Sequence, residues 1–327
     1  MAVCRVLVVT NLWPYPDDPG YGSFVKAQME SLRPLGVEYD LLFINGRESR
    51  WNYFRSVRHM RRHLRAAHYD FIHAHMGLSG WVARCQMRVP VVVSFLGDDV
   101  LGKFDRHGRA TFYGRLLQAS SYILARLVRS VIVKSKEMKR RLRLDSAQVI
   151  PNGVDLNLFR SLDGGEARRA LGIDLSKKWV LFPYNCAERG KRYDLIESAV
   201  ARARDQIANL EILHVYRVPQ ERMALYMSAA DLMVMASMTE GSPNAVKEAL
   251  ACNLPVVTVD VGDTAELIAQ TEGHHLVPRE VGAIASAIVQ VCRRSTRARS
   301  RERMTQFSIE RVAERILDVY RGAVQGV

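Results

Sequence analysis

The chain has 327 residues, of which 48% are hydrophobic, so it can bury the cores of two ordinary domains. No apolar run approaches the roughly 18 to 20 residues that a membrane-spanning helix needs, and a strand-like run begins at Val3, so the pattern argues against an integral membrane protein and predicts a cytoplasmic one. The five cysteines are scattered and form no C-x-x-C pair, which argues against a zinc or redox site.

The formal net charge of +13 is concentrated in the first half of the chain. Residues 1–160 hold 25 Lys and Arg against 13 Asp and Glu, and the remaining residues hold 22 against 21. Nucleic-acid-binding proteins and proteins that attach to anionic lipid share this kind of asymmetry. Interleaved aromatic residues and a recognisable nucleic-acid-binding module are missing from the sequence, so we expect no nucleic-acid partner.

In the first half, short β-branched runs alternate with amphipathic segments of helix length, which is the pattern of βαβ units and a parallel sheet. The expected strands span 3–9, 37–44, 71–74, 91–95 and 131–134, and the expected helices span 24–35, 51–67, 80–87 and 111–129. The loop after the first strand is rich in Pro and Gly, and Gly20 and Gly22 precede the next helix. Glycines allow a close approach of backbone to a ligand, although a plain turn uses them too.

The predicted helix over 51–67 carries two stripes on its surface. One is apolar, and the other contains Arg55, Arg58, Arg62 and Arg65. A second basic run covers 134–143. The pattern fits an ordinary solvated face as well as a helix that lies on anionic lipid, so an anionic membrane surface is a candidate partner.

The stretch at 150–160 combines Pro, Asn and Gly and interrupts the apolar pattern, as a linker does. The alternation then resumes with expected strands at 180–183, 210–215, 232–235, 256–259 and 275–277, and a helix at 309–324. We therefore expect an α/β protein with two Rossmann-like doubly wound domains, residues 1–155 and 156–305. Residues 306–327 form a C-terminal helix that is expected to pack back toward the first domain. Parallel sheets bind ligands at the carboxyl ends of their strands, so the site is expected in the interdomain cleft.

The most informative stretch is 239–257, TEGSPNAVKEALACNLPVV. Ser242 is a suitable N-cap and Pro243 suits the first helical position, so we predict a helix over 243–252. The free amides at the start of such a helix attract phosphate, and a preceding glycine permits close approach. The candidate phosphate-binding residues are Gly241, Ser242, Pro243, Asn244 and Ala245.

Two carboxylates belong to the same stretch. Glu240 precedes the predicted helix and Glu248 lies two turns into it, so one can contact a sugar while the other contacts a ribose. As a glycosidase pair they would lie up to ~12 Å apart at ~1.5 Å rise per residue. Hydrolysis uses carboxyl separations of roughly 5 to 9.5 Å, so it is the weaker interpretation.

Glu240 and Glu248 resemble the E-x₇-E motif of family 4 retaining glycosyltransferases, and the following A-C-N-L-P-V-V is similar to that family's A-x-G-x-P-V-V. IPNGVD at 150–155 resembles the family's interdomain P-N-G-V-D, and SAADLMVMAS at 228–237 is similar to its strand before the acidic motif. The resemblance implies the GT-B fold, a nucleotide-sugar bound by the second domain, no metal and no cofactor.

The resemblance further implies a metal-independent, hexosyltransferase-type enzyme. It would move a sugar with retention to a glycan or lipid-linked acceptor, in bacterial polysaccharide or glycolipid synthesis, with peripheral attachment to the inner face of the cell membrane. The alternative within the same fold is a GT-B nucleotide-sugar epimerase. A nicotinamide dehydrogenase would need G-x-G-x-x-G after the first strand, and this loop does not contain it.

By the same resemblance, Glu240 contacts the transferred sugar and Glu248 the ribose. Lys191 falls on the family's lysine, which meets the charge of the leaving diphosphate. The family's arginine falls on Asn185 or Cys186, so the paired cations are not fully reproduced. Because guanidinium groups bind phosphate through two contacts, the candidates to replace it are Arg189 and Arg192.

In the acceptor half, Gly22 is the better match to the family's glycine-rich loop. Where the family often has a histidine that contacts the donor sugar, this chain has Leu96. Asp98 or Asp99 would supply the polar contact instead, although Asp99 is equally compatible with a helix N-cap. His73 and His75 end a strand, and we expect one of them to be a core residue, which leaves His75 as a candidate sugar contact.

Overall fold

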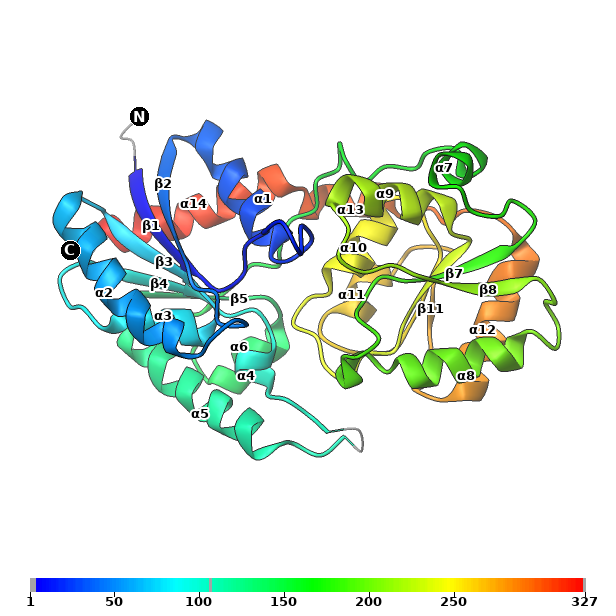
Figure 1. The fold of residues 1–327 in the computed structure, drawn as a ribbon, viewed down its shortest axis with the longest axis horizontal. Helices are drawn as coiled ribbons and strands as arrows, with labels where there is room; N and C mark the ends of the chain where they lie inside the picture. The colour runs from blue at the N-terminus through cyan, green and yellow to red at the C-terminus, as the bar shows by residue number, and fades with distance from the viewer. Residues whose placement is uncertain (1–3, 106–107, 326–327) are drawn as a thin grey trace.

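The computed structural model describes residues 4–105 and 108–325 and consists of two α/β units placed side by side (Figure 1). The first contains a six-stranded sheet in the order β2-β1-β3-β4-β5-β6, and the second a five-stranded sheet in the order β11-β10-β9-β7-β8. Every pair of neighbouring strands is parallel. The expectation of two doubly wound α/β domains is therefore confirmed.

The elements of the first unit alternate along the chain as predicted. Its strands are β1 (Cys4–Thr10), β2 (Val37–Phe43), β3 (Phe71–His75), β4 (Val91–Ser94), β5 (Ser130–Val133) and β6 (Gln148–Val149). Its helices are α1 (Ser23–Leu32), α2 (Trp51–Ala66), α3 (Gly77–Arg84), α4 (Asp98–Leu101), α5 (Phe112–Leu127) and α6 (Lys136–Leu142), with a short 3₁₀ helix η1 (Arg33–Leu35). Val3, the first residue of the first expected strand, lies outside the described residues.

Helices cover both faces of the first sheet. On one face, Met29 of α1 and Tyr320 of the last helix pack on strand residues, and on the other, Met60 of α2 and Leu124 of α5 do so. The strands are accordingly apolar on both sides, as parallel strands between two helical layers must be. Thr111 caps α5, because its hydroxyl accepts a hydrogen bond from the amide of Gly114.

The second unit repeats this arrangement. Its strands are β7 (Lys178–Phe182), β8 (Leu210–His214), β9 (Leu232–Met235), β10 (Val256–Thr258) and β11 (His275–Leu276). Its helices are α7 (Gly164–Leu171), α8 (Tyr193–Ala203), α9 (Gln220–Ala229), α10 (Asn244–Ala251), α11 (Thr264–Ile268), α12 (Val281–Arg294) and α13 (Arg301–Met304), with 3₁₀ helices η2 (Arg189–Lys191) and η3 (Thr305–Phe307). Among the helices of the described ranges, none is long and apolar enough to cross a bilayer.

The last helix, α14 (Ile309–Gln325), follows the second unit in sequence but packs on the first (Figure 1). The two chain crossings between the units are joined by backbone hydrogen bonds, from Val154 to Phe307 at 2.9 Å and from Ile309 to Val154 at 3.0 Å. Tyr320 packs on Phe71 with ring centroids 4.5 Å apart. The first core is thus completed by residues from the end of the described chain.

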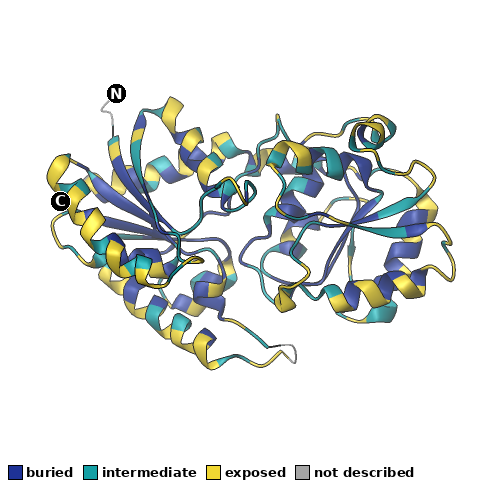
Figure 2. Cartoon of the chain, viewed as in Figure 1, coloured by how far each residue is buried: buried dark blue, intermediate teal, exposed yellow. Residues whose placement is uncertain are grey.

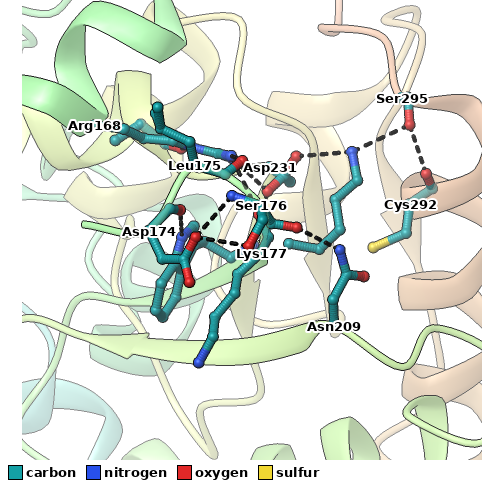
Figure 3. Close-up of polar contacts among 12 residues, drawn as sticks. Arg168, Asp174, Leu175, Ser176, Lys177, Asn209, Asp231, Cys292 and Ser295 are labelled. Carbon is teal, nitrogen blue, oxygen red and sulfur yellow. Dashed lines mark hydrogen bonds and ion pairs between the residues drawn. The ribbon is translucent and has the colours of Figure 1, made fainter.

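A polar network holds the second sheet at the amino ends of its strands (Figure 3). Asp231, just before β9, accepts hydrogen bonds from Arg168 at 2.7 Å and from the backbone amide of Trp179 at 2.7 Å, and it pairs with Lys178 at 3.2 Å. Parallel strands bind ligands at their carboxyl ends, and this network lies at the opposite ends. We therefore assign it a structural role.

Candidate functional site

A cavity of about 440 Å³ lies between the two units, at the carboxyl ends of strands from both sheets. The first unit contributes the loop after β1, the loop after β2 and Leu96 after β4. The second contributes the loops after β7 and β8 and the segment from Glu240 into α10. The cavity is where two doubly wound sheets are expected to bind a ligand.

Helix α10 begins at this cavity. Pro243 occupies its cap position, and no side chain caps its first turn. The prediction that Ser242 is the cap and Pro243 the first helical residue is therefore wrong by one position. The Ser242 hydroxyl instead accepts a hydrogen bond at 3.0 Å from Lys247, which is fully buried and also donates to the Asn152 carbonyl at 2.8 Å. A buried ammonium needs such acceptors, so the Ser242 hydroxyl is held by Lys247 and does not cap the helix. The first backbone amides of α10 therefore remain available to an anion in the cavity.

Glycines make the close approach around the cavity possible. A Cβ on Gly241 would lie 2.6 Å from the carbonyl oxygen of Leu96, so the two units meet closely at this point. Gly22 has φ of 66° and a Cβ there would lie 2.2 Å from the carbonyl carbon of Leu12. Both positions therefore require glycine, and the close approach at Gly241 is to the first unit's backbone.

Lys191 and Glu240 form an ion pair in the cavity, with Nζ and Oε1 2.6 Å apart and side chains 21% and 15% exposed. Desolvation is the largest influence on the pKa of Lys191 and lowers it, but the charge and hydrogen bond of Glu240 and the charges of Glu188 and Asp98 outweigh it, so the pKa is raised. Lys191 therefore carries a positive charge at neutral pH. Its Nζ also lies 4.5 Å from the ring centroid of Tyr184.

Glu248 lines the same cavity from α10. Burial raises the pKa of its carboxyl to about 7, and the neighbouring ammonium of Lys247 opposes the rise. Burial has removed water from this carboxyl, so hydrogen bonds from a ligand, such as those of two ribose hydroxyls, would stabilise its ionised form.

The cavity brings together nine of the residues singled out in the sequence, namely Gly22, Lys191, Glu240, Gly241, Ser242, Pro243, Asn244, Ala245 and Glu248. Five others do not line it. Arg189 is exposed, and Arg192 adopts φ of 55° and pairs with Asp194 at 2.9 Å. Neither arginine is brought to the position of the missing family cation.

The three acceptor-side candidates also lie outside the cavity lining. The carboxylate of Asp99 is buried and accepts hydrogen bonds from the amides of Gly97 at 2.9 Å and Gly77 at 3.2 Å, and burial raises its pKa to about 6. Asp98 pairs with Lys103 at 3.7 Å. His75 is fully buried, and its Nε2 lies 3.1 Å from the side-chain nitrogen of Gln28.

Two arginines that the sequence analysis did not single out do line the cavity. Arg47 follows β2 and Arg217 follows β8, and both meet Asp18, at 3.1 Å and 3.5 Å. The Asp18 side chain is 3% exposed, and Arg47 stacks on the ring of Tyr21 at 3.7 Å. In the sequence, the two arginines are marked only by lying in loops that follow strands. Many other residues lie in such loops, so this position does not single them out.

Residues 4–158 match the family model described as Glycosyltransferase Family 4, and residues 190–294 match the one described as Glycosyl transferases group 1. The chain belongs to glycosyltransferase family 4. The predicted family membership is confirmed. The first matched range ends within the linker at 150–160, and the second lies wholly in the second unit.

Relatives of this family-4 chain differ widely in sequence. The putative teichuronic acid biosynthesis glycosyltransferase TuaC of Bacillus subtilis (strain 168) is 23% identical over 88% of each chain. The solved sucrose-phosphate synthase of Thermosynechococcus elongatus superposes with a TM-score of 0.83 at 20% identity, covering 100% of both chains. HepE of Anabaena, solved in complex with UDP-glucose, gives a TM-score of 0.72 at 16% identity, covering 97% of this chain and 99% of its own.

These superpositions show that the family-4 chain has the GT-B fold, as the sequence resemblance implied. Together with the matched family models they identify it as a glycosyltransferase. Leu96 lies in the cavity lining at the place of the family's frequent histidine. An apolar side chain there cannot hydrogen-bond a sugar hydroxyl, so any such contact must come from other groups.

Proposed function

We propose that the chain is a retaining, metal-independent glycosyltransferase that moves a hexosyl-type sugar from a nucleotide-sugar donor to a glycan or lipid-linked acceptor. The observation that carries the proposal is the convergence of Lys191, Glu240 and Glu248 with the uncapped start of α10 in one cavity. The setting we propose is bacterial polysaccharide or glycolipid synthesis. The names of TuaC and of the HepE complex with UDP-glucose support the pathway and the donor class.

Each group in the cavity has a defined task in this proposal. The amides of α10 and the ammonium of Lys191 bind the donor diphosphate and stabilise the negative charge that grows on it as the glycosidic bond breaks. Glu248 accepts hydrogen bonds from the ribose, and Glu240 accepts them from the transferred sugar. The acceptor attacks the face that the diphosphate leaves, so no protein nucleophile takes part. The nucleotide-sugar is a substrate, and we propose no metal and no cofactor.

We also propose that the first domain meets an anionic membrane surface, on the cytoplasmic side. The four arginines predicted on α2, Arg55, Arg58, Arg62 and Arg65, are all exposed. The second basic run contributes less than expected because Lys134 is buried, with 1% of its surface exposed. Cations near an anionic leaflet contribute about 1 kcal/mol each, so the α2 arginines alone support reversible attachment.

Donor binding is the direct test of the proposed site. We expect Glu248→Ala to lower the affinity for the bound nucleotide-sugar by about 10- to 100-fold, because a charged hydrogen bond contributes about 1.5 to 3 kcal/mol. Glu302→Ala, which removes an exposed carboxylate from α13, serves as the matched control. Calorimetry with UDP-, GDP- and ADP-sugars measures the affinities, and equal affinity in Glu248→Ala and wild type would show that Glu248 does not bind the donor.

The transfer reaction is tested by measuring the release of nucleoside diphosphate with and without EDTA. We expect release that depends on acceptor and survives the chelator. Complete loss that Mn²⁺ or Mg²⁺ restores would contradict the metal-free part of the proposal. An epimerised free nucleotide-sugar, formed without acceptor, would identify the chain as the alternative epimerase.

A further inference from the structure

Exposed large apolar side chains are concentrated on one face of the first domain. Ten of the thirteen found among the described residues lie on α2, α3, α5 or the turn after α3. These three helices cover the same face of the first sheet, because Met60, Val82 and Leu124 share one core. Helix α5 alone carries six of them, namely Phe112, Tyr113, Leu116, Tyr122, Ile123 and Leu127. Exposed apolar residues are normally scattered singly over a protein surface. Their concentration on one face indicates an interaction surface.

Helix α5 carries apolar side chains on both its inner and its outer side. Leu124 and Ala125 face the sheet and are buried. On the outer side, Phe112 is 84% exposed, Leu116 57% and Ile123 53%, at spacings of four and seven residues that place them in one stripe. Figure 2 shows the outer side of α5 as exposed along much of its length. An apolar stripe on a helix is normally covered by a neighbouring element, and among the described residues nothing covers the outer stripe of α5.

The exposed apolar residues reach the side of the domain where the cleft opens. Helices α2 and α5 both begin at their ends nearer the second unit (Figure 1). Their first turns lie close together, since the guanidinium of Arg50 is 6.0 Å from the ring centroid of Tyr113. Trp51 and Phe54 of α2 are in ring contact at 5.5 Å and are 69% and 71% exposed. Trp51 and Phe54 therefore lie near the start of α5, on the side of the domain where the cleft opens.

Positive charge surrounds this apolar surface. The exposed arginines of α2 flank Phe54, and Arg115 and Arg126 are exposed on α5. Between α5 and α6 lies a surface cavity lined by Tyr122 and by Arg140, Arg141 and Arg143, with Glu137 as its one acidic residue. A second copy of this chain would present the same positive face and be repelled. An anionic lipid surface accepts apolar side chains and attracts cations together, so the charge favours lipid as the partner.

We propose that the outer stripe of α5 inserts into the interfacial region of an anionic bilayer, together with Trp51 and Phe54 at the start of α2. This deepens the membrane contact proposed above by adding an apolar anchor to the arginines, and it is independent of the transfer chemistry. The insertion holds the mouth of the cleft at the lipid surface. An acceptor that carries a lipid anchor then reaches the site without leaving the bilayer.

The test is co-sedimentation with phosphatidylcholine vesicles and with mixed phosphatidylcholine and phosphatidylglycerol vesicles, at low and high salt. Electrostatic attraction fades as the Debye length shrinks from ~10 Å at 0.1 M to ~3 Å at 1 M, whereas apolar insertion persists. We expect wild type to retain part of its binding to the mixed vesicles at high salt. The triple variant Phe112→Ser, Leu116→Ser, Ile123→Ser should partition at least ~10-fold less, because three apolar side chains no longer leave water.

Leu175→Ser and Leu276→Ser, which alter exposed apolar residues of the second domain, are the controls and should bind as wild type does. The substituted stripe is exposed, so the thermal midpoint of the triple variant should match wild type. Equal vesicle binding by the triple variant and wild type would overturn the proposal. Failure of wild type to bind anionic vesicles would overturn it as well. Light scattering that shows a dimer in wild type and a monomer in the triple variant, without vesicle binding, would assign the stripe to a second copy. Donor calorimetry in solution stays unaffected in each case, so failure here is distinct from failure of the transfer proposal.

Discussion

Buried basic side chains lie close together beneath α14. His73 and His75 of β3 are fully buried with ring centroids 4.2 Å apart, and Lys134 of β5 is buried beside them. His73 hydrogen-bonds with the Tyr320 hydroxyl through Nδ1 at 2.7 Å and with Ser94 through Nε2 at 2.9 Å. Desolvation, followed by the charge of Lys134, lowers the pKa of His73 to about 3. The imidazole is therefore neutral in the folded chain at neutral pH.

This neutral histidine predicts acid sensitivity. Between pH 3 and its ordinary pKa of about 6.5, His73 takes up a proton only when the chain unfolds, so the free energy of unfolding falls as pH falls through that window. Urea unfolding at several pH values measures the slope. We expect His73→Asn to be less stable than wild type at neutral pH but to lose less stability on acidification. A slope as steep as that of wild type would show that His73 does not cause the acid sensitivity.

The site residues divide according to how local their sequence signal is. The meeting of Glu240 and Glu248 in the cavity was predictable because a fixed spacing within one short stretch of sequence carries the signal. Arg47 and Arg217 were not predictable, because they lie in separate loops. The fold of the first unit brings Arg47 to Asp18, and the packing of the two units brings Arg217 there. The capping error has a physical cause as well, since the cap rule takes no account of the buried ammonium of Lys247 that uses the hydroxyl of Ser242.

At the scale of elements, every described strand except β6 was expected from the sequence, as were α2, α5 and α14, whereas α4, α8 and α12 were not. The four residues of α4 and the two of β6 are too short to show a period. The helix expected over 80–87 is α3, which begins at Gly77 directly after Met76, a residue with φ of 75°. That left-handed residue turns the chain sharply from β3 into α3, which sequence periodicity does not reveal.

Helix α14 offers a test of how the first domain is stabilised. Ile316 is fully buried in the first core, so Ile316→Ala should lower the free energy of unfolding by about 2 to 4 kcal/mol through lost burial and a cavity. Val324→Ala on the same helix, at a site 41% exposed, is the control and should change stability little. Urea unfolding followed by circular dichroism measures both. Equal stability of the two variants would mean that α14 adds little to the first domain.

At the scale of the whole molecule, loops from the two domains touch beside the cavity. Asp18 of the first domain pairs with Arg217 of the second, and a Cβ on Gly20 would lie 2.9 Å from the carbonyl oxygen of Val218. A second pair, between Lys136 and Glu266 at 3.0 Å, also joins the domains but has both side chains largely exposed. Exposed pairs contribute little, so the contact at Asp18 is the more important of the two.

Removing the Asp18 carboxylate should open the cleft. Asp18→Ala leaves the guanidinium groups of Arg47 and Arg217 facing each other without their shared carboxylate, and like charges repel. We expect the radius of gyration from small-angle X-ray scattering to exceed that of wild type. Glu266→Ala, which breaks the exposed pair, should scatter as wild type does. Identical scattering from Asp18→Ala and wild type would show that the domains stay together without this contact.

The place of α14 in the fold also bears on the order in which the protein matures on the ribosome. Every strand of the second sheet emerges before α14, whose side chains cover Val8 and Phe71 of the first. Domains fold as units while the chain is made, so the second domain has all its strands before the first domain receives α14. Until α14 arrives, α1 alone covers that face of β1 and β3, and part of the face stays exposed. During that interval the exposed face offers nascent-chain chaperones a binding surface that the finished enzyme no longer has.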